Sequence, residues 1–177
     1  MLKIISTSER KLTKAEIVQA HRILRTAYEV TEEEVWGKNY DRLFIEDFTE
    51  LIEEGNIYVA YLDDVIVGVI HAYPENETYF KFGLLAVDFN CGGKGVGSAL
   101  IKMAEEVALK NGAKQMNIEI LRVKDIDVPH KARLAAYYER LGYHHTHSAD
   151  ANCLIPDWKY KLLITPSNFD FYTKELV

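Results

Sequence analysis

Four glycines within six residues offer this chain a site for an anionic ligand. The segment 91–98 reads Cys-Gly-Gly-Lys-Gly-Val-Gly-Ser and separates an apolar stretch, 83–87, from an amphipathic one, 99–110. That order predicts a strand, a glycine loop and a helix. Because glycine lacks a Cβ, such a loop can bring its backbone N–H groups against a ligand, and the first turn of the helix adds unpaired donors and the positive end of its dipole. Phosphate or pyrophosphate is the ligand that this arrangement favours.

Two common phosphate loops fit the segment poorly. A Walker loop requires Gly-x-x-x-x-Gly-Lys-Ser/Thr, whereas here Lys94 precedes Gly95 and no Lys-Ser or Lys-Thr pair follows. A dinucleotide-binding loop requires Gly-x-Gly-x-x-Gly. Started at Gly93 or at Gly95, that pattern meets Ser98 or Leu100 in place of its third glycine. The Walker loop is therefore excluded, and the dinucleotide loop is a weak match.

A third kind of loop matches the segment, and a second motif supports it. Residues 85–101 resemble the acyl-CoA loop of the GNAT superfamily of N-acetyltransferases. Residues 135–143, Ala-Ala-Tyr-Tyr-Glu-Arg-Leu-Gly-Tyr, resemble a later helix of that family, which commonly ends in Tyr-Glu-Lys/Arg-x-Gly-Phe/Tyr. The chain departs from the family at Gly92, where Arg or Gln usually stands, and near His130 and Lys131, where an Asn is common. The resemblance extends over residues 12–143.

The resemblance implies how acetyl-CoA, the cosubstrate of the family, is bound. Two parallel strands, 79–87 and 115–123, are expected to splay apart and leave backbone groups that the pantetheine amides would pair with. The pyrophosphate is expected on the loop amides, and Lys131 or His130 is expected to replace the missing Asn beside the pantetheine arm. The residues expected to bind acetyl-CoA are Leu85, Ala86, Val87, Gly92, Gly93, Lys94, Gly95, Val96, Gly97, Ser98 and Lys131.

The reaction that the resemblance implies is attack of an amine on a thioester, which needs a proton for the departing thiolate. Tyr138 is the candidate acid, because a phenol with a pKa of about 10 stays protonated at neutral pH and can protonate a thiol with a pKa of about 8.5. Tyr138 also fits a packing role, since a tyrosine on an aromatic-rich helix commonly lies in the core. Tyr137 points about 100° away on the same helix and is expected to be structural.

A general base for the amine is less well defined. Glu119 is a carboxylate within an otherwise apolar strand, 115–123, where burial would raise its pKa toward a useful value. Glu119 also fits a solvent-facing position on a half-buried strand. Asp125 and Asp127 in the following loop are alternatives, and ordered water is another. The strand 79–87 offers no carboxylate and only Lys81.

Periodicity supplies the elements that position these residues. Thr13 followed by Glu16 is a capping-box pattern at the start of a helix. Asp41 is the predicted N-cap of a second helix that ends at Gly55. The remaining predicted elements are a first strand at 2–5, a hairpin of 57–62 and 65–73, strands at 79–87 and 115–123, and a helix at 98–110.

This order predicts an α+β fold rather than the βα alternation of a doubly wound sheet. As in the GNAT family, a mixed and mostly antiparallel sheet, with a splayed parallel pair in its middle, is expected to be flanked by helices. The chain has 177 residues and is 48% hydrophobic, which suits one core. Residues 1–177 are therefore expected to form a single N-acetyltransferase domain.

Charge and cysteine content narrow the partners and the compartment. A net charge of −6 disfavours binding to nucleic acid or to an anionic membrane, both of which attract basic surfaces. Cys91 and Cys153 are too few for a disulfide framework, and neither a secretory signal nor a membrane span is recognised. The expected location is the cytoplasm. His145 and His147 are expected on one face of a strand, but too few further ligands follow for a metal site.

The acceptor is expected near residues 28–44, where the resemblance places the acceptor pocket. Glu32, Glu33, Glu34 and Asp41, together with Trp36, suit a cationic ligand, and they equally suit a solvated acidic loop. The aromatic tail, 157–177, is expected to add a last strand to the sheet and could line the same pocket.

The sequence thus predicts an N-acetyltransferase that moves an acetyl group from acetyl-CoA to a primary amine of a small molecule or protein by direct transfer. Two alternatives stay open. One is a non-catalytic acyl-CoA-binding module, which is favoured by the glycine at position 92, where the family usually has Arg or Gln. The other is an NAD(P)-dependent oxidoreductase, for which the missing third glycine is unfavourable. A homodimer is common in the family.

Overall fold

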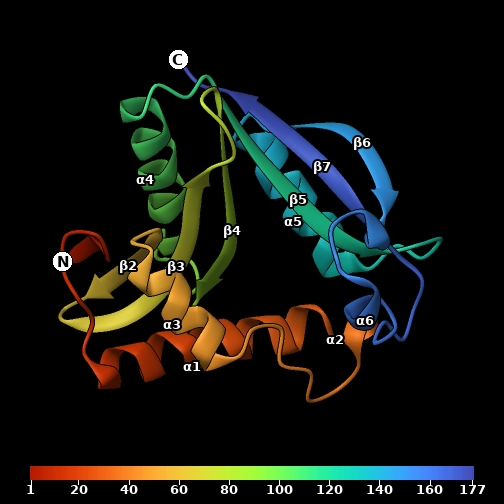
Figure 1. Cartoon of the computed structure of the whole chain (residues 1–177), viewed down its shortest axis with the longest axis horizontal. Coiled ribbons are helices and arrows are strands. Elements are labelled where there is room, and N and C mark those ends of the chain that lie inside the picture. The colour runs from red at the N-terminus through yellow and green to blue at the C-terminus, as the bar shows by residue number, and fades with distance from the viewer.

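The computed structural model describes all residues, 1–177, and contains a single mixed sheet with helices on both faces (Figure 1). Its helices and strands follow one another in the order β1 (Leu2–Ser6), α1 (Lys14–Thr31), α2 (Glu33–Trp36), α3 (Ile45–Glu53), β2 (Ile57–Leu62), β3 (Val65–Pro74), β4 (Tyr79–Val87), α4 (Val96–Lys110), β5 (Gln115–Val123), α5 (Pro129–Arg140), β6 (His144–Asp150), α6 (Asp157–Tyr160) and β7 (Ser167–Glu175).

The sheet has seven strands in the order β1-β2-β3-β4-β5-β7-β6. All neighbours are antiparallel except β4 and β5, which are parallel. The predicted α+β class with one parallel pair in the middle is therefore confirmed. The last strand, β7, enters between β5 and β6, so the edge of the sheet on this side is β6. None of the helices combines the length and the apolar character needed to span a bilayer.

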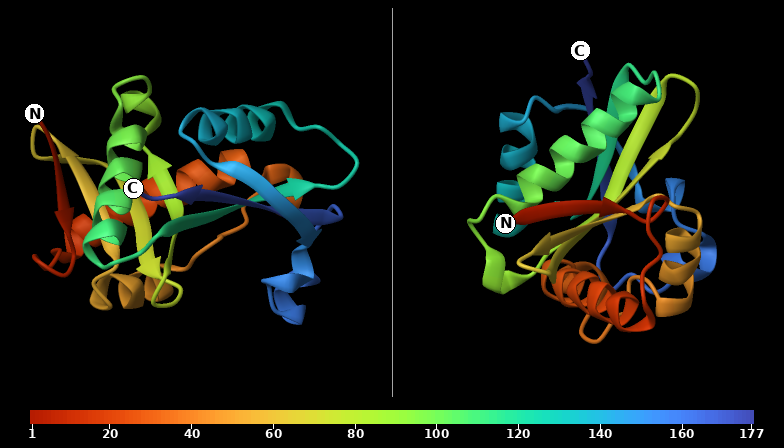
Figure 2. Two further views of the ribbon diagram at one scale, coloured as in Figure 1. Left: turned by 90° about the horizontal axis from the view of Figure 1, so that it is seen from above. Right: turned by 90° about the vertical axis from the view of Figure 1, so that its left-hand side faces the viewer.

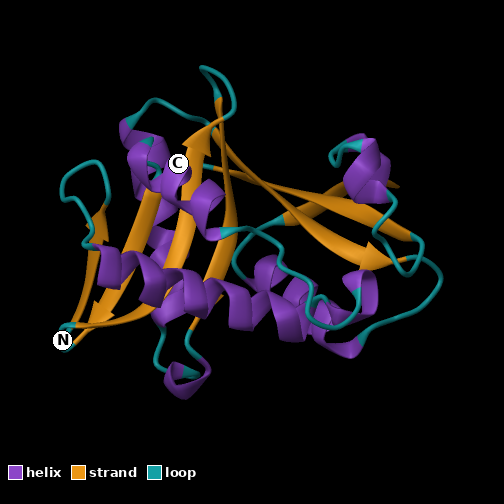
Figure 3. Ribbon diagram, turned by 60° about the horizontal axis from the view of Figure 1, so that its bottom comes forward, coloured by secondary structure: helices purple, strands orange, loops and turns teal.

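The two faces of the sheet carry different helices. On one face, α4 and α5 pack against side chains such as Val67, Ile70 and Met116. On the other face, α1 and α3 pack against Ile66 and Val69. In the right-hand view of Figure 2, α1 lies below the strands and α4 above them, and Figure 3 shows the long helix α1 crossing in front of the strands. Strand β3 thus serves two cores, but its residues do not alternate strictly between them, because its pairing with β2 shifts register just after Ile66.

A β-bulge in β4 changes which face its side chains point to. Leu84 has a φ of +50°, which a residue with a Cβ adopts only at a cost in strain. Before it, Phe80 and Phe82 belong to the core under α4, whereas Leu84 and Ala86 pack under α1. The pairing with β3 shifts register at the same place. The extra residue bends β4 and exchanges its two faces.

Pairing between the parallel strands ends early. Tyr79, Phe80 and Lys81 of β4 pair with residues 115–117 of β5, and no later residue of β4 has a partner there. Figure 1 shows the two strands leaving the top of the molecule together and running apart. Beyond Lys81, the edge of β4 that faces β5 is therefore without a strand partner.

Two local predictions about helix starts were wrong or shifted. Asp41 does not cap α3, which follows Phe44 without a side-chain cap. Its carboxylate instead lies 2.9 Å from Nε of Arg25, because an ion pair with α1 is available. The helix predicted from residue 98 begins at Val96.

The histidines of β6 also differ from the prediction. His145 pairs with Tyr172 and His147 with Phe171, with a register shift between them. Neighbouring residues of β7 point to opposite faces, so the two histidines lie on opposite faces of the sheet. The bulge at Thr146 is the reason, because it adds one residue to the strand. The structure contains no group of three or more His, Cys, Asp or Glu residues arranged to hold a metal ion.

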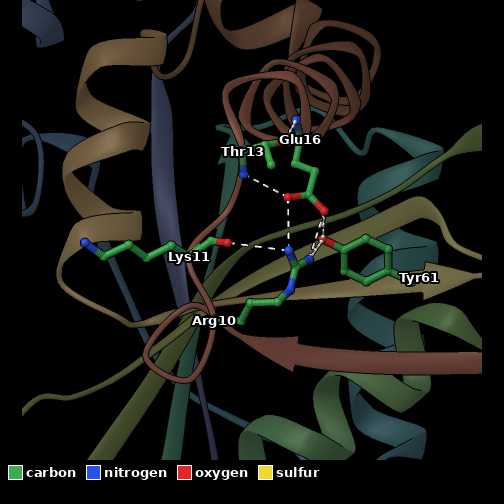
Figure 4. A network of polar contacts seen from close by, with 5 residues as sticks. All are labelled: Arg10, Lys11, Thr13, Glu16 and Tyr61. Atoms are coloured by element: carbon green, nitrogen blue, oxygen red, sulfur yellow. Dashed lines mark hydrogen bonds and ion pairs between the residues drawn. The ribbon is translucent and has the colours of Figure 1, made fainter.

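The start of α1 is held by a polar network that includes the predicted capping box (Figure 4). Thr13 and Glu16 exchange hydrogen bonds between side chain and backbone. Arg10 donates to both carboxylate oxygens of Glu16, at 3.2 and 2.8 Å, and the Tyr61 hydroxyl donates to one of them at 2.8 Å. Glu16 thus ties the N-terminus of α1 to β2.

Replacing Glu16 tests this network through the pH dependence of stability. Hydrogen bonding from Arg10 lowers the pKa of Glu16 from 4.5 to about 2. The stabilisation that follows is complete above pH 4.5 and is lost as the pH falls toward 2, because protonation then favours the unfolded chain. In urea denaturation, we expect Glu16→Gln to unfold more easily than wild type at pH 7, and the difference to narrow by about pH 3.

The exposed Glu9 offers a matched control, and Glu9→Gln is expected to leave stability unchanged. A difference between Glu16→Gln and wild type that stays constant between neutral and acidic pH would contradict the charge-based explanation.

Candidate active site

A cavity of about 300 Å³ lies between the diverging strands and α5. Phe82 to Val87 of β4 line one side, and Ile118 to Leu121 of β5 line the other. The α1–α2 segment and the cleft-facing side of α5 close it. Its remaining lining residues are Ala27, Tyr28, Thr31, Glu32, Arg42, Phe89, His130, Lys131, Leu134, Tyr138 and Phe169. The unpaired part of β4 therefore borders a space that a ligand can enter.

The glycine loop forms a second, shallower depression at the N-terminus of α4. Gly93 and Gly95 both have a φ of +75°, a left-handed conformation that favours glycine, and Gly95 is the N-cap of α4. The depression is lined by Val87, Cys91, Gly92, Gly93, Gly95, Val96, Gly97, Ser98 and Tyr137. Val87 also lines the larger cavity, so the two hollows meet at the end of β4.

The residues predicted to bind acetyl-CoA divide between these hollows. Leu85 and Ala86 line the larger cavity, and Gly92 to Ser98, except Lys94, line the depression. The Lys94 side chain is exposed beside it. The Val96 side chain is buried in the core, so only the backbone of this residue is available to a ligand in the depression.

Tyr138 is packed in the core and also borders the cavity. Its ring is buried against Phe82 and Tyr143, with ring centroids 6.0 and 5.9 Å away. The same residue lines the cavity, and its hydroxyl makes no hydrogen bond within the chain. Burial raises its pKa, so the phenol stays protonated throughout the physiological range. The structure thus places a protonated donor on the cleft wall.

Tyr137 faces the other hollow. Its hydroxyl lies 2.8 Å from Oγ of Ser98 and borders the depression of the glycine loop. Neighbouring residues of a helix point roughly 100° apart, so Tyr138 faces the cavity while Tyr137 faces the glycine loop. The sequence did not predict the contact between Tyr137 and Ser98, because it forms only when α5 docks beside α4.

Glu119 lines the cavity from β5, half-buried. Its Oε1 lies 2.6 Å from Nζ of Lys81 on β4. Burial opposes the charge of Lys81, but hydrogen bonding and attraction from Glu119 raise its pKa overall. Glu119 is thus a paired carboxylate at the cleft. The alternatives Asp125 and Asp127 do not line the cavity.

Within the acidic segment around α2, Glu32 is neither solvated nor free to bind a cation, whereas Glu33 is exposed to solvent. The Glu32 residue is 4% exposed. Both of its carboxylate oxygens accept hydrogen bonds from Nη1 of Arg42, at 2.9 and 2.7 Å, and one accepts from the Trp36 indole at 3.1 Å. Arg42 stacks on the Tyr28 ring at 4.5 Å. Sequence reasoning missed Arg42, and no local pattern marked it.

Lys131 and His130 lie at this end of the cavity and not at the glycine loop. Nζ of Lys131 is 3.6 Å from Oε1 of Glu32, and burial lowers its pKa. Nε2 of His130 lies 2.8 Å from the carbonyl oxygen of Thr31. The first turn of α5 is therefore tied to the end of α1.

Comparisons with known proteins agree with this architecture. The family model of the acetyltransferase (GNAT) domain matches residues 53–145. No curated protein matches the chain.

Many solved structures share the fold, at low sequence identity. Ard1 from Thermoplasma volcanium is 17% identical with a TM-score of 0.68, and the match covers 99% of this chain and 98% of that one. An aminoglycoside 6'-N-acetyltransferase in complex with coenzyme A is 16% identical, with a TM-score of 0.69 and coverage of 100% and 97%. A GNAT family acetyltransferase from Elizabethkingia anophelis with acetyl-CoA bound is 17% identical, with a TM-score of 0.65 and coverage of 99% and 98%.

Removing the charge of Glu32 is expected to destabilise the protein. Glu32→Gln leaves Arg42 and Lys131 without their shared counter-charge, and we expect a loss of about 3 kcal/mol, as for breaking a buried ion pair. Urea denaturation at pH 7 measures this loss in the free energy of unfolding. Glu33, the exposed neighbour of Glu32, provides the control, because Glu33→Gln removes an equal charge that is in contact with solvent. Equal stability of the two variants would mean that the buried pairing contributes little.

Proposed function

The chain belongs to the GNAT family of acetyltransferases, and we propose that it is an acetyl-CoA-dependent N-acetyltransferase that acts on a primary amine of a small molecule or protein. The observation that carries the proposal is the meeting of three features at one cleft. These are the unpaired edge of β4, the glycine loop at the start of α4 and the protonated Tyr138.

The two hollows suit the two parts of acetyl-CoA. The free backbone groups of Leu85 and Val87 can pair with the pantetheine amides, which supply the donors and acceptors that a neighbouring strand would otherwise provide. The left-handed glycines and the N–H groups of α4 suit the pyrophosphate. The glycine at position 92 removes a side chain but no backbone donor. Val87, at the junction of the hollows, then marks the path of the pantetheine arm.

Direct transfer requires the groups that line the larger cavity. The amine nitrogen attacks the thioester carbon, the C–S bond breaks, and Tyr138 gives its proton to the departing thiolate. Burial raises the pKa of Tyr138, and a thiolate that leaves into the same cavity would also be disfavoured by loss of solvent, which favours a neutral thiol product. Glu119, directly or through water, accepts the proton that the amine loses.

Calorimetry with acetyl-CoA, CoA and NAD(H) tests the donor site. We expect the two CoA species to bind and NAD(H) not to bind, and Gly95→Ala to weaken acetyl-CoA binding at least tenfold. Gly112→Ala is the matched control, because Gly112 also has a positive φ, +81°, with open space around its Cβ position, but lies at the other end of α4. Both variants carry the same backbone strain, so equal affinities would overturn the loop assignment.

Tyr138→Phe tests the proton donor. We expect acetyl-CoA binding to be unchanged and kcat to fall about a hundredfold, which is typical for loss of a general acid. Release of free thiol with a panel of amines measures the rate. Tyr137→Phe, which removes only the contact with Ser98, is expected to keep kcat at saturating acetyl-CoA. An unchanged rate for Tyr138→Phe at every pH would refute the role, and acetyl-CoA binding without transfer to any amine would favour a non-catalytic module.

A further inference from the structure

The end of the cavity beside α2 carries a surplus of positive charge. Arg42 and Lys131 share a single carboxylate, that of Glu32. The next carboxylate, Glu34, lies 3.2 Å from Nε2 of His130. A third cation, Lys159, approaches the backbone of Arg42, with Nζ 3.4 Å from its carbonyl oxygen. No further carboxylate lines this end of the cavity.

The two cations that line the cavity keep hydrogen-bond donors unused. The Lys131 side chain is 5% exposed, yet its Nζ lies 3.6 Å from Glu32, beyond hydrogen-bond distance, and it makes no hydrogen bond. Arg42 contacts Glu32 through Nη1 alone, so its Nη2 and Nε atoms have no partner. None of these nitrogens is among the fully enclosed side-chain atoms that lack a partner, so they are open to the cavity that both residues line. These donors therefore point to an anionic group supplied by a ligand.

We propose that the acceptor of this enzyme is a small amino acid, whose carboxylate binds between Lys131 and Arg42 while its amine faces Tyr138 and Glu119. The inference rests on the proposed N-acetyltransferase function and specifies its substrate class. The planar guanidinium of Arg42 matches a carboxylate. An acceptor with only a positive charge finds the Glu32 carboxylate already occupied by Arg42 and Trp36.

The dimensions of the site agree with such an acceptor. Lys131 and Tyr138 lie seven residues apart on α5, which separates their Cα atoms by about 10 Å along the helix axis, and both line the same cavity. A volume of about 300 Å³ holds the acetyl end of the cosubstrate and a small molecule. An acceptor whose amine and carboxylate are a few bonds apart occupies only part of the roughly 10 Å between these backbone positions, and the two side chains must cover the rest.

Matched pairs of acceptors test the proposal. The panel contains amino acids from glycine to 6-aminohexanoate, each with its carboxamide, and both kcat/KM and binding to the CoA-saturated protein are measured. We expect the best carboxylate to exceed its carboxamide at least tenfold in kcat/KM, the effect of a charge-assisted hydrogen bond. Lys131→Met should abolish most of this preference while leaving the Kd of acetyl-CoA unchanged. Arg133→Met removes an exposed charge from the same helix and should preserve the preference.

The outcomes separate this inference from the proposed function. Transfer to amines with no preference for a carboxylate overturns the inference and leaves the N-acetyltransferase function standing. Weakened binding of acetyl-CoA by Lys131→Met also overturns it, because Lys131 then serves the donor. If no amine is acetylated, amino-acid binding that Lys131→Met abolishes still supports the carboxylate site, while the proposed function fails. Absence of any carboxylate binding at millimolar concentration overturns the site itself.

Discussion

The early end of pairing between β4 and β5 is the constraint on which the rest of the structure depends. Backbone N–H and C=O groups cannot stay buried without partners, so strands that separate after Lys81 must leave a space where a ligand or water reaches them. The bulge at Leu84 bends β4 at this place and exchanges its faces. The cavity, the glycine loop that follows β4 and the wall provided by α5 all take their positions from this divergence.

Buried charges hold the walls of that space in place. Glu32 at the end of α1 binds Arg42 from the segment before α3 and faces Lys131 on α5. Buried ion pairs contribute little net stability compared with apolar packing, but they are sensitive to geometry. Removing one partner is nevertheless costly, because the other charge stays buried, so the network fixes the arrangement of three elements. It also leaves Arg42 and Lys131 lining the cavity.

Two adjacent tyrosines connect the two hollows through one helix. On α5, Tyr137 contacts Ser98 at the glycine loop and Tyr138 lines the cavity. A displacement of α5 would therefore move both contacts together. Glu105 on α4 accepts a hydrogen bond from Tyr143 at 2.7 Å and fixes the chain just after α5, so the same packing that buries Tyr138 positions its hydroxyl.

By itself the sequence determined the glycine loop, the position of Tyr138 on a late helix, the capping box of α1 and the α+β order of elements. These depend on local properties: the freedom of glycine, the period of apolar residues and side chains a few positions apart. Only the tertiary structure decided that Glu32 is buried by Arg42 and Lys131, that Glu119 pairs with Lys81, and that bulges at Leu84 and Thr146 exchange the faces of β4 and β6. A buried charge takes whichever partner the fold brings within reach, and a bulge arises where two strands with separate cores must pair. Neither is specified by the neighbours of a residue along the chain.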